Sequence, residues 1–148
     1  SMTYKITFIP YGQISFVLPS LVNYLAKSEF WTRKRANVDD IIRFLYTGQM
    51  HLWAVYDPDS LKADGYVITE IKQYPQCKML VFQYSAGEFG TLDGVGDLMF
   101  NTLERFAKDS GCAGIEFFGR PGWGPHAKKH GCTVKTMVYE KYFNGVHS

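Results

Sequence analysis

Gly94 and Gly96 are the first residues of this sequence whose type and spacing could do chemistry. They separate a β-branched and aromatic segment, residues 78–85, from a segment whose apolar residues have helical spacing. Backbone N–H groups at a helix start lack partners within the helix and lie at the positive end of its dipole, so they can bind phosphate oxygens. A second interpretation is that the glycines only permit a tight turn. On the pattern alone, this structural interpretation is the simpler one.

Four side chains could move protons in a reaction beside this turn. Glu88 and Glu116 could act as a base, directly or through a water molecule, whereas Tyr84 and Tyr139 could donate a proton to a leaving group. Each has a structural alternative. A glutamate in a turn or on the outer face of a strand is usually solvated, and tyrosines in strands usually pack.

A metal site is not expected. His126 and His130 are one helical turn apart and Cys132 follows them, which resembles the spacing of metal ligands. Two ligands on one turn and one thiol do not complete a tetrahedral site, so solvated histidines are the favoured interpretation.

The elements that position these residues form an α+β pattern. Asn37 is a typical N-cap, and the two aspartates at 39 and 40 favour a helix start after it. Three strands predicted in succession form an antiparallel meander, which leads into a central βαβ unit. We expect strands at 4–9, 51–56, 65–71, 78–85, 113–118 and 133–142. We expect helices at 19–27, between Asn37 and Gly48, from a first turn at residues 94–96 to about residue 109, and at 126–130. This predicts a mixed, largely antiparallel sheet with helices on both faces.

Composition restricts the class of protein. The 148 residues are 46% apolar, which is enough for one core, so residues 1–148 should form a single domain. A net charge of +2 without a long basic run argues against nucleic acid as a partner, and no stretch is long and apolar enough to suggest a membrane partner. Three cysteines without a C-x-x-C pair are typical of a reducing compartment, so we expect a cytoplasmic protein.

The order of these elements resembles the GNAT (Gcn5-related N-acetyltransferase) superfamily across nearly the whole chain. The family motif Gln/Arg-x-x-Gly-x-Gly/Ala corresponds to residues 91–96, Thr-Leu-Asp-Gly-Val-Gly. Residues 107–112 are similar to the family's helix end, and residues 119–123, Gly-Arg-Pro-Gly-Trp, resemble divergent GNAT-like proteins of tailed bacteriophages. The usual long polar side chain is replaced by Thr91, and the family's frequent acid, a tyrosine, is replaced by Ala127.

The resemblance implies a site and an activity. The backbone of the turn would bind the pyrophosphate of acetyl-CoA, through Thr91, Leu92, Asp93, Gly94, Val95, Gly96 and Asp97. The backbone of Gln83, Tyr84, Ser85 and Ala86 would bind the pantetheine arm. The implied activity is acetyl-CoA-dependent N-acetyl transfer to an amine-bearing small molecule or protein, by direct attack on the thioester.

Two further expectations follow from departures from the family pattern. Thr91, Asp93 and Ala127 motivate an alternative, in which a phage protein keeps the fold without catalysis and acts as a virion component or a binder of host proteins. The strand region after Gly131 is short for the family, so a strand supplied by a second copy, and hence a homodimer through the C-terminal strand, is a further prediction.

Overall fold

The computed structural model describes residues 4–28, 35–60, 62–87, 92–119 and 121–143. Its elements follow the order expected from the sequence as far as the fifth strand. They are β1 (Lys5–Ile9), η1 (Tyr11–Gln13), α1 (Ile14–Ser28), α2 (Val38–Tyr46), β2 (His51–Asp57), β3 (Lys62–Gln73), β4 (Lys78–Gly87), α3 (Leu92–Asp109), β5 (Gly114–Phe117), η3 (Pro121–Trp123) and α4 (Gly124–Lys129).

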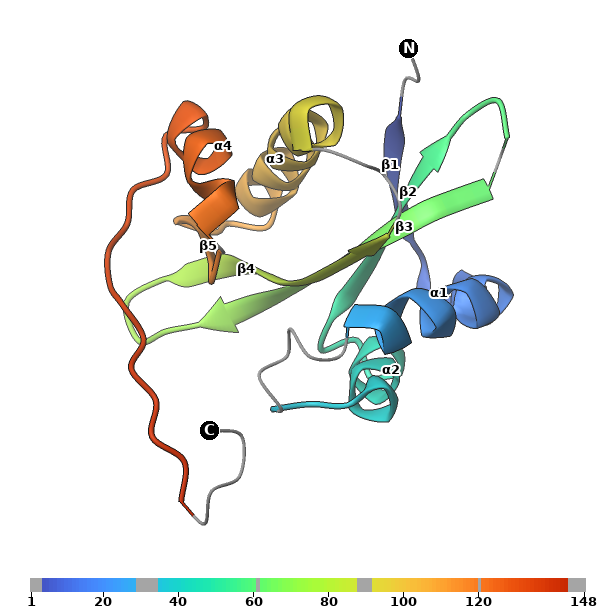
Figure 1. Ribbon diagram of the computed structural model, residues 1–148, viewed down its shortest axis with the longest axis horizontal. Coiled ribbons are helices and arrows are strands. Elements are labelled where there is room, and N and C mark those ends of the chain that lie inside the picture. Colours follow the sequence, from blue (N-terminus) through green and yellow to red (C-terminus); the bar gives the residue numbers. More distant parts are fainter. Residues whose placement is uncertain (1–3, 29–34, 61, 88–91, 120, 144–148) are drawn as a thin grey trace.

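A five-stranded sheet in the order β1-β2-β3-β4-β5 forms the centre of the fold. The first three pairings are antiparallel, whereas β5 runs parallel to β4 after the crossover through α3. Helices α1 and α2 lie on one face of the sheet, and α3 and α4 lie on the other (Figure 1). The predicted α+β class, the meander and the βαβ unit are therefore confirmed.

Each face of the sheet has its own apolar core. Alternation along β3 sends Tyr66 and Ile68 toward α1 and α2, while Val67 packs toward α3. The stripe predicted for α3 is confirmed, since Met99 and Leu103 are buried against the sheet. None of the described helices is both long enough and apolar enough to cross a membrane.

The start of α2 is set by a local signal. The Asn37 side chain accepts a hydrogen bond from the Asp40 N–H at 2.9 Å, and the Asp40 carboxylate accepts one from the Asn37 N–H at 3.0 Å. This capping box satisfies N–H groups that would otherwise lack partners. It confirms Asn37 as the predicted N-cap, whereas the hydrogen bond from the Asn37 N–H to Asp40 was not predicted. After the helix, Gly48 has a φ of 79°, a conformation that glycine adopts without strain.

The predicted start of the first helix at residue 19 is wrong. Helix α1 begins at Ile14 and contains Pro19 in its second turn. Proline lacks an N–H and usually marks a helix start. Here the buried residues Ile14, Leu21 and Leu25 extend one apolar stripe through the proline, and burial of that stripe outweighs the single lost hydrogen bond.

The predicted strand at 133–142 is also wrong. Residues 132–142 have no assigned secondary structure, and the chain runs away from the sheet, past the end of the β3–β4 hairpin (Figure 1). Val134 is 91% exposed and Tyr139 is 86% exposed. Arg35 holds the far end of this segment, donating to the Tyr142 hydroxyl at 2.6 Å. Alternating sequence makes a segment able to join a sheet, but pairing also requires an edge within its reach.

Candidate functional site

Strand β4 contains a bulge at Gln83. Thr69 of β3 pairs with Phe82, and the preceding Ile68 pairs with Tyr84, so Gln83 has no partner on β3. A bulge of this kind leaves one residue outside the ladder and redirects the side chains next to it. Here it places the side chains of Gln83 and Tyr84 on the α1/α2 face, where Gln83 contacts Glu70 and Tyr84 packs against the buried cluster.

Beyond the bulge, one edge of β4 has no strand partner among the described residues. Strand β5 pairs with β4 from Met79 to Phe82 and then ends, while β4 continues to Gly87. The β5-facing N–H and C=O groups of this last part of β4 are therefore not used by the sheet. The four residues predicted to bind a pantetheine arm, Gln83, Tyr84, Ser85 and Ala86, lie in this stretch.

Two carboxylates lie in one row across the sheet beside the bulge. Glu70 of β3 pairs with Val81 of β4, which in turn pairs with Glu116 of β5. Residues paired across neighbouring strands point to the same face, so both carboxylates project from the α1/α2 face. With strands about 4.8 Å apart, their backbones are separated by roughly 10 Å.

Glu70 was not among the residues selected from the sequence. Its Oε2 accepts a hydrogen bond from Gln83 Nε2 at 2.9 Å, and its Oε1 accepts a longer one from Gln49 Nε2 at 3.4 Å. A signal was present, because Glu70 is a charged residue that directly follows five buried residues of its strand, 65–69. Its role as a hydrogen-bond partner of the bulged residue depends on the pairing register, which the sequence did not show.

Glu116 is hydrogen-bonded in a different way. The Tyr74 hydroxyl, from the turn between β3 and β4, donates to Glu116 Oε1. This hydrogen bond is the main cause that raises the pKa of Tyr74. Glu116 thus lies on the same face as Glu70, with one carboxylate oxygen bound by a phenol.

Tyr84 lies at the bulge and is half-buried. Burial is the largest cause that raises the pKa of its hydroxyl, followed by the negative charges of Glu70 and Asp40. The hydroxyl therefore stays protonated at neutral pH and can act as a proton donor.

Tyr139, a predicted proton donor, does not lie at this place. Tyr139 is in the exposed C-terminal segment, and its hydroxyl contacts only the sulfur of Met137, at 3.9 Å, among the hydrogen-bonding contacts described for it. Glu88 and Thr91 lie outside the described residues, so their predicted roles stay predictions.

Helix α3 begins earlier than the glycines suggested. Its first residue is Leu92, so Gly94 is the third residue and Gly96 the fifth. The first residues of a helix have N–H groups without helical partners, whereas the fifth residue donates within the helix. Leu92, Asp93 and Gly94 therefore supply the available N–H groups, and the expectation that Gly96 also lies in the first turn is wrong. Val95 is buried against the sheet.

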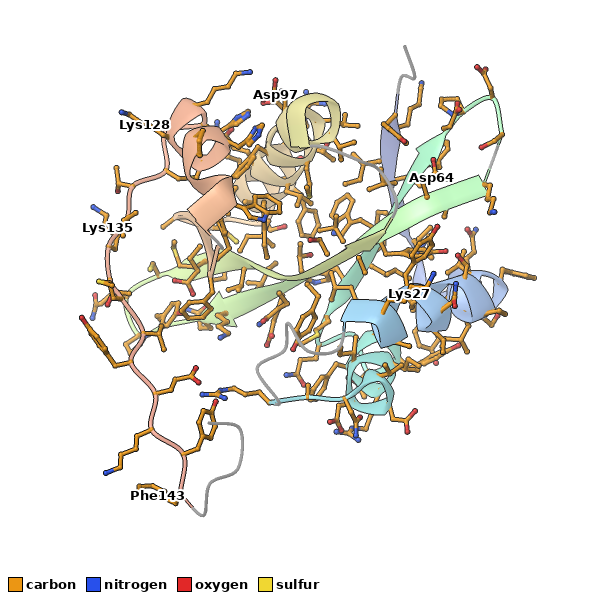
Figure 2. All side chains as sticks on the ribbon, viewed as in Figure 1. Lys27, Asp64, Asp97, Lys128, Lys135 and Phe143 are labelled. Carbon is orange, nitrogen blue, oxygen red and sulfur yellow. The ribbon has the colours of Figure 1, made fainter. Side chains whose placement is uncertain are left out.

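Asp97 contacts helix α4. Its Oδ2 accepts from Lys129 Nζ at 2.8 Å, and its Oδ1 is 2.8 Å from His130 Nε2; Figure 2 labels Asp97 on α3, next to α4. Hydrogen bonds from Lys129 and then His130 hold the pKa of Asp97 below its usual range. Its negative charge is thus balanced at the start of α3.

An aromatic cluster joins α3, α4 and the parallel strands. The Phe100 ring lies parallel to the His130 ring at 4.6 Å and meets Phe117 edge-on at 5.8 Å, while Phe117 stacks on Phe82 at 5.5 Å. These contacts fix β5 and α4 against α3. His130 is used in this packing, and no group of three potential ligands for a metal occurs within the described ranges.

Comparisons with known proteins show what fold this is. An aminoglycoside acetyltransferase from an uncultured soil metagenomic sample, in complex with sisomicin, has a TM-score of 0.68 at 12% identity over 96% of each chain. A predicted acetyltransferase from Clostridium acetobutylicum, solved with acetyl-CoA, has a TM-score of 0.67 at 15% identity over 100% of both chains. A GNAT family acetyltransferase from Staphylococcus aureus has a TM-score of 0.64 at 12% identity, over 96% of this chain and 100% of that one.

In sequence, no protein-family model and no curated protein matches this chain. The chain therefore has the fold of GNAT acetyltransferases. Its sequence identity to these structures, 12–15%, is too low to indicate a substrate.

Proposed function

We propose that this chain is an N-acetyltransferase that transfers the acetyl group of acetyl-CoA to an amine. The observation that carries the proposal is the end of β4, which is bulged at Gln83 and, among the described residues, has no strand partner on its β5 side beyond Phe82. This stretch is followed, after a short connection, by the start of α3, within a fold shared with solved acetyltransferases.

The residues present fit acetyl-CoA in two places. Backbone N–H and C=O groups along residues 83–87 could bind the amide groups of the pantetheine arm, because the sheet does not use that edge. N–H groups of Leu92, Asp93 and Gly94 could bind the pyrophosphate at the helix start. The Asp97 carboxylate is balanced by Lys129 and His130, so it would repel the phosphates less than an unpaired carboxylate.

Acetyl-CoA would supply an activated acyl group, and the protein would position the amine and move protons. The amine nitrogen attacks the thioester carbonyl carbon, a C–N bond forms, and the C–S bond breaks with its electron pair on sulfur. The Tyr84 hydroxyl, protonated at neutral pH, can give the thiolate its proton. Glu116, Glu88 and Tyr139 remain candidates for proton transfer on the sequence prediction alone.

Calorimetric titration with acetyl-CoA tests this proposal. The wild-type protein should bind it, and Gly94→Arg, which adds a long side chain at the helix start, should abolish binding without lowering the melting temperature. Gly12→Arg is a matched control, because Gly12 lies in η1 and a Cβ added there meets nothing within 4 Å. Absence of wild-type binding at millimolar acetyl-CoA would refute the proposal.

The exposed C-terminal segment, residues 133–143, indicates a protein partner besides acetyl-CoA and the amine. Val134, Met137, Tyr139 and Phe143 expose apolar surface on a chain of alternating pattern, and β5 is the last strand of its sheet. We propose that residues 133–143 pair with a second copy of this chain, because an unpaired strand edge readily accepts another strand.

The alternative function is a binding protein that has lost catalysis, such as a virion component or a binder of host proteins in the cytoplasm of a phage-infected bacterium. The same exposed segment supports it. Binding of acetyl-CoA without turnover of any simple amine would select this alternative over the enzyme.

A further inference from the structure

Arg35, which precedes α2, holds the far end of the C-terminal segment, residues 133–143. Its guanidinium donates from Nη1 to the Tyr142 hydroxyl oxygen at 2.6 Å and from Nη2 to Glu140 Oε1 at 3.3 Å. It also lies over the Tyr142 ring, 5.7 Å from the ring centroid, and the Tyr142 hydroxyl donates to Glu140 Oε2. The three side chains therefore bond one another in a closed set, which we call the Arg35 latch.

The middle of the C-terminal segment differs from its latched end. Val134 and Tyr139 are 91% and 86% exposed, whereas the Glu140 side chain in the latch is 25% exposed. The hydrogen bonds described for the middle are local, from Thr136 and Tyr139 to Met137. The segment pairs with none of the described strands. The latch therefore fastens a segment whose middle lies in solvent.

The start of the segment has a direction that α4 sets. The His130 ring stacks on Phe100 at 4.6 Å, and Gly131 follows with a φ of 80°. The Cys132 N–H donates to the Ala127 carbonyl oxygen at 2.9 Å, as in a Schellman helix end. From there the chain runs away from the sheet, past the end of the β3–β4 hairpin (Figure 1). A segment released at its far end would thus point away from β5 of its own chain.

Pairing with another strand would open the latch. Residues 133–143 are rich in β-branched and aromatic types, which favour strands. Strand β5 is at the end of the described sheet, so the sheet does not use the backbone groups on its outer side. Glu140 and Tyr142 belong to the residues that would pair, and they would be carried away from Arg35. The latch and pairing with a second copy therefore exclude each other.

We propose that the Arg35 latch is an autoinhibitory contact, which keeps the C-terminal segment on its own chain and opposes its exchange onto β5 of a second copy. The inference rests on the pairing of residues 133–143 proposed above. Latched monomer and exchanged dimer are two states of one chain, and Arg35 bonds Glu140 and Tyr142 in the first state alone. Any change that weakens these contacts therefore shifts the population toward the dimer.

Sedimentation equilibrium of wild type and Arg35→Met tests the latch. Methionine keeps an apolar stem but has neither the charge nor the donors of arginine. We expect the Kd of the dimer to be about tenfold lower in Arg35→Met, because one hydrogen bond to a charged group stabilises the latched state by about that factor. Tyr142→Phe should lower the Kd in the same direction, since it removes the acceptor of the 2.6 Å hydrogen bond. Salt screens the Arg35–Glu140 ion pair, so the Kd should depend more on salt in wild type than in Arg35→Met.

The matched control is Arg43→Met. Arg43 on α2 makes the same kinds of contact, an ion pair with Asp40 at 3.1 Å and a position over the Phe44 ring, 5.2 Å from its centroid. These partners lie on its own helix, so this variant should leave the Kd of the dimer unchanged.

Hydrogen exchange measured by mass spectrometry identifies the strand that the segment joins. Amides of residues 133–142 and of β5 should exchange more slowly at concentrations at which the dimer forms, and rapidly in the monomer. A monomeric Arg35→Met protein with slow exchange in residues 133–142 would overturn the exchange, because the segment would then have joined its own sheet.

The remaining outcomes distinguish the latch from the pairing on which it rests. If both proteins dimerise with Kd values within about twofold of each other, the latch is overturned and the pairing stands, because the lost hydrogen bond should change the Kd far more. If both stay monomeric at millimolar concentration, the pairing and the latch are both overturned. These measurements use no acetyl-CoA, so their result does not depend on the proposed acetyl transfer.

Discussion

Replacing Thr69 by valine should destabilise this protein more than replacing it by serine, although valine is closer to threonine in shape. Thr69 is fully buried on β3, next to the bulge. Its Oγ1 accepts from Trp53 Nε1 at 3.0 Å and lies 3.1 Å from His51 Nδ1. Burial keeps the His51 ring neutral, so with its proton on Nε2 the ring can accept the Thr69 hydroxyl hydrogen.

The magnitude follows from what each variant removes. Thr69→Val leaves the buried Trp53 N–H without an acceptor, which costs about 1–3 kcal/mol of the free energy of unfolding. Thr69→Ser keeps the hydroxyl and loses one methyl group, which costs about 0.8 kcal/mol. For a domain of this size, a cost of about 2 kcal/mol lowers the melting temperature by about 4–8 °C.

Urea unfolding followed by circular dichroism would measure these differences. Trp53→Phe removes the indole N–H, so the double variant with Thr69→Val should cost less than the sum of the two single variants. A Thr69→Val protein at least as stable as Thr69→Ser, or additive costs in the double variant, would refute the proposed hydrogen-bond network.

The remaining predictions concern pH, a helix cap, the contact of α4 and the C-terminal segment. Burial lowers the pKa of His51, so as the pH falls this ring is protonated in the unfolded chain before it is protonated in the folded protein. The free energy of unfolding should therefore fall as the pH drops below about 6.5. His51→Gln should flatten that fall in urea titrations at pH 5.5 and 7.5, and an unchanged slope would contradict it. Asn37→Ala should lower the free energy of unfolding by about 1 kcal/mol, and Asn37→Asp should not, since only alanine loses the cap. The pKa of Asp97 is lowered by Lys129 and His130, so its contribution to stability should be present above about pH 4 and be lost in stronger acid. In Asp97→Asn, the free energy of unfolding should therefore depend less on pH between pH 2 and 5 than it does in wild type. The same pH dependence in both proteins would show that the contact of Asp97 with Lys129 and His130 is not the source of the acid sensitivity. A chain ending at Cys132 should be monomeric by light scattering under conditions in which the full chain is a dimer; a full chain that stays monomeric would exclude pairing through this segment.

Several elements could be predicted because their signals are local. The α2 cap needs only Asn37 and Asp40, three residues apart, and the structure confirms it. The stripe of α3 is a matter of helical spacing, and the meander arises from strands separated by short turns. The resemblance to GNAT proteins was visible in this order of elements, and the solved structures with the same fold confirm the architecture.

The errors arose where a local signal competed with distant contacts. Pro19 reads as a helix start, but Ile14 is buried in the same core as Leu25, and that core lengthens the helix. Residues 133–142 alternate like a strand, yet they pair with none of the described strands of their own chain.

The candidate site was predictable only in part, for the same reason. The sequence by itself determined the first five strands, the presence of a helix between the fourth and the fifth, and the chemistry that their side chains can do. Tertiary structure alone decided that Gln83 is bulged, that Glu70 lies next to it and that Glu70 is bonded to Gln49, 21 residues away in the chain. Backbone propensities act over a few neighbouring residues, whereas the register of a strand depends on the burial of whole faces, so one shifted residue changes which side chains meet.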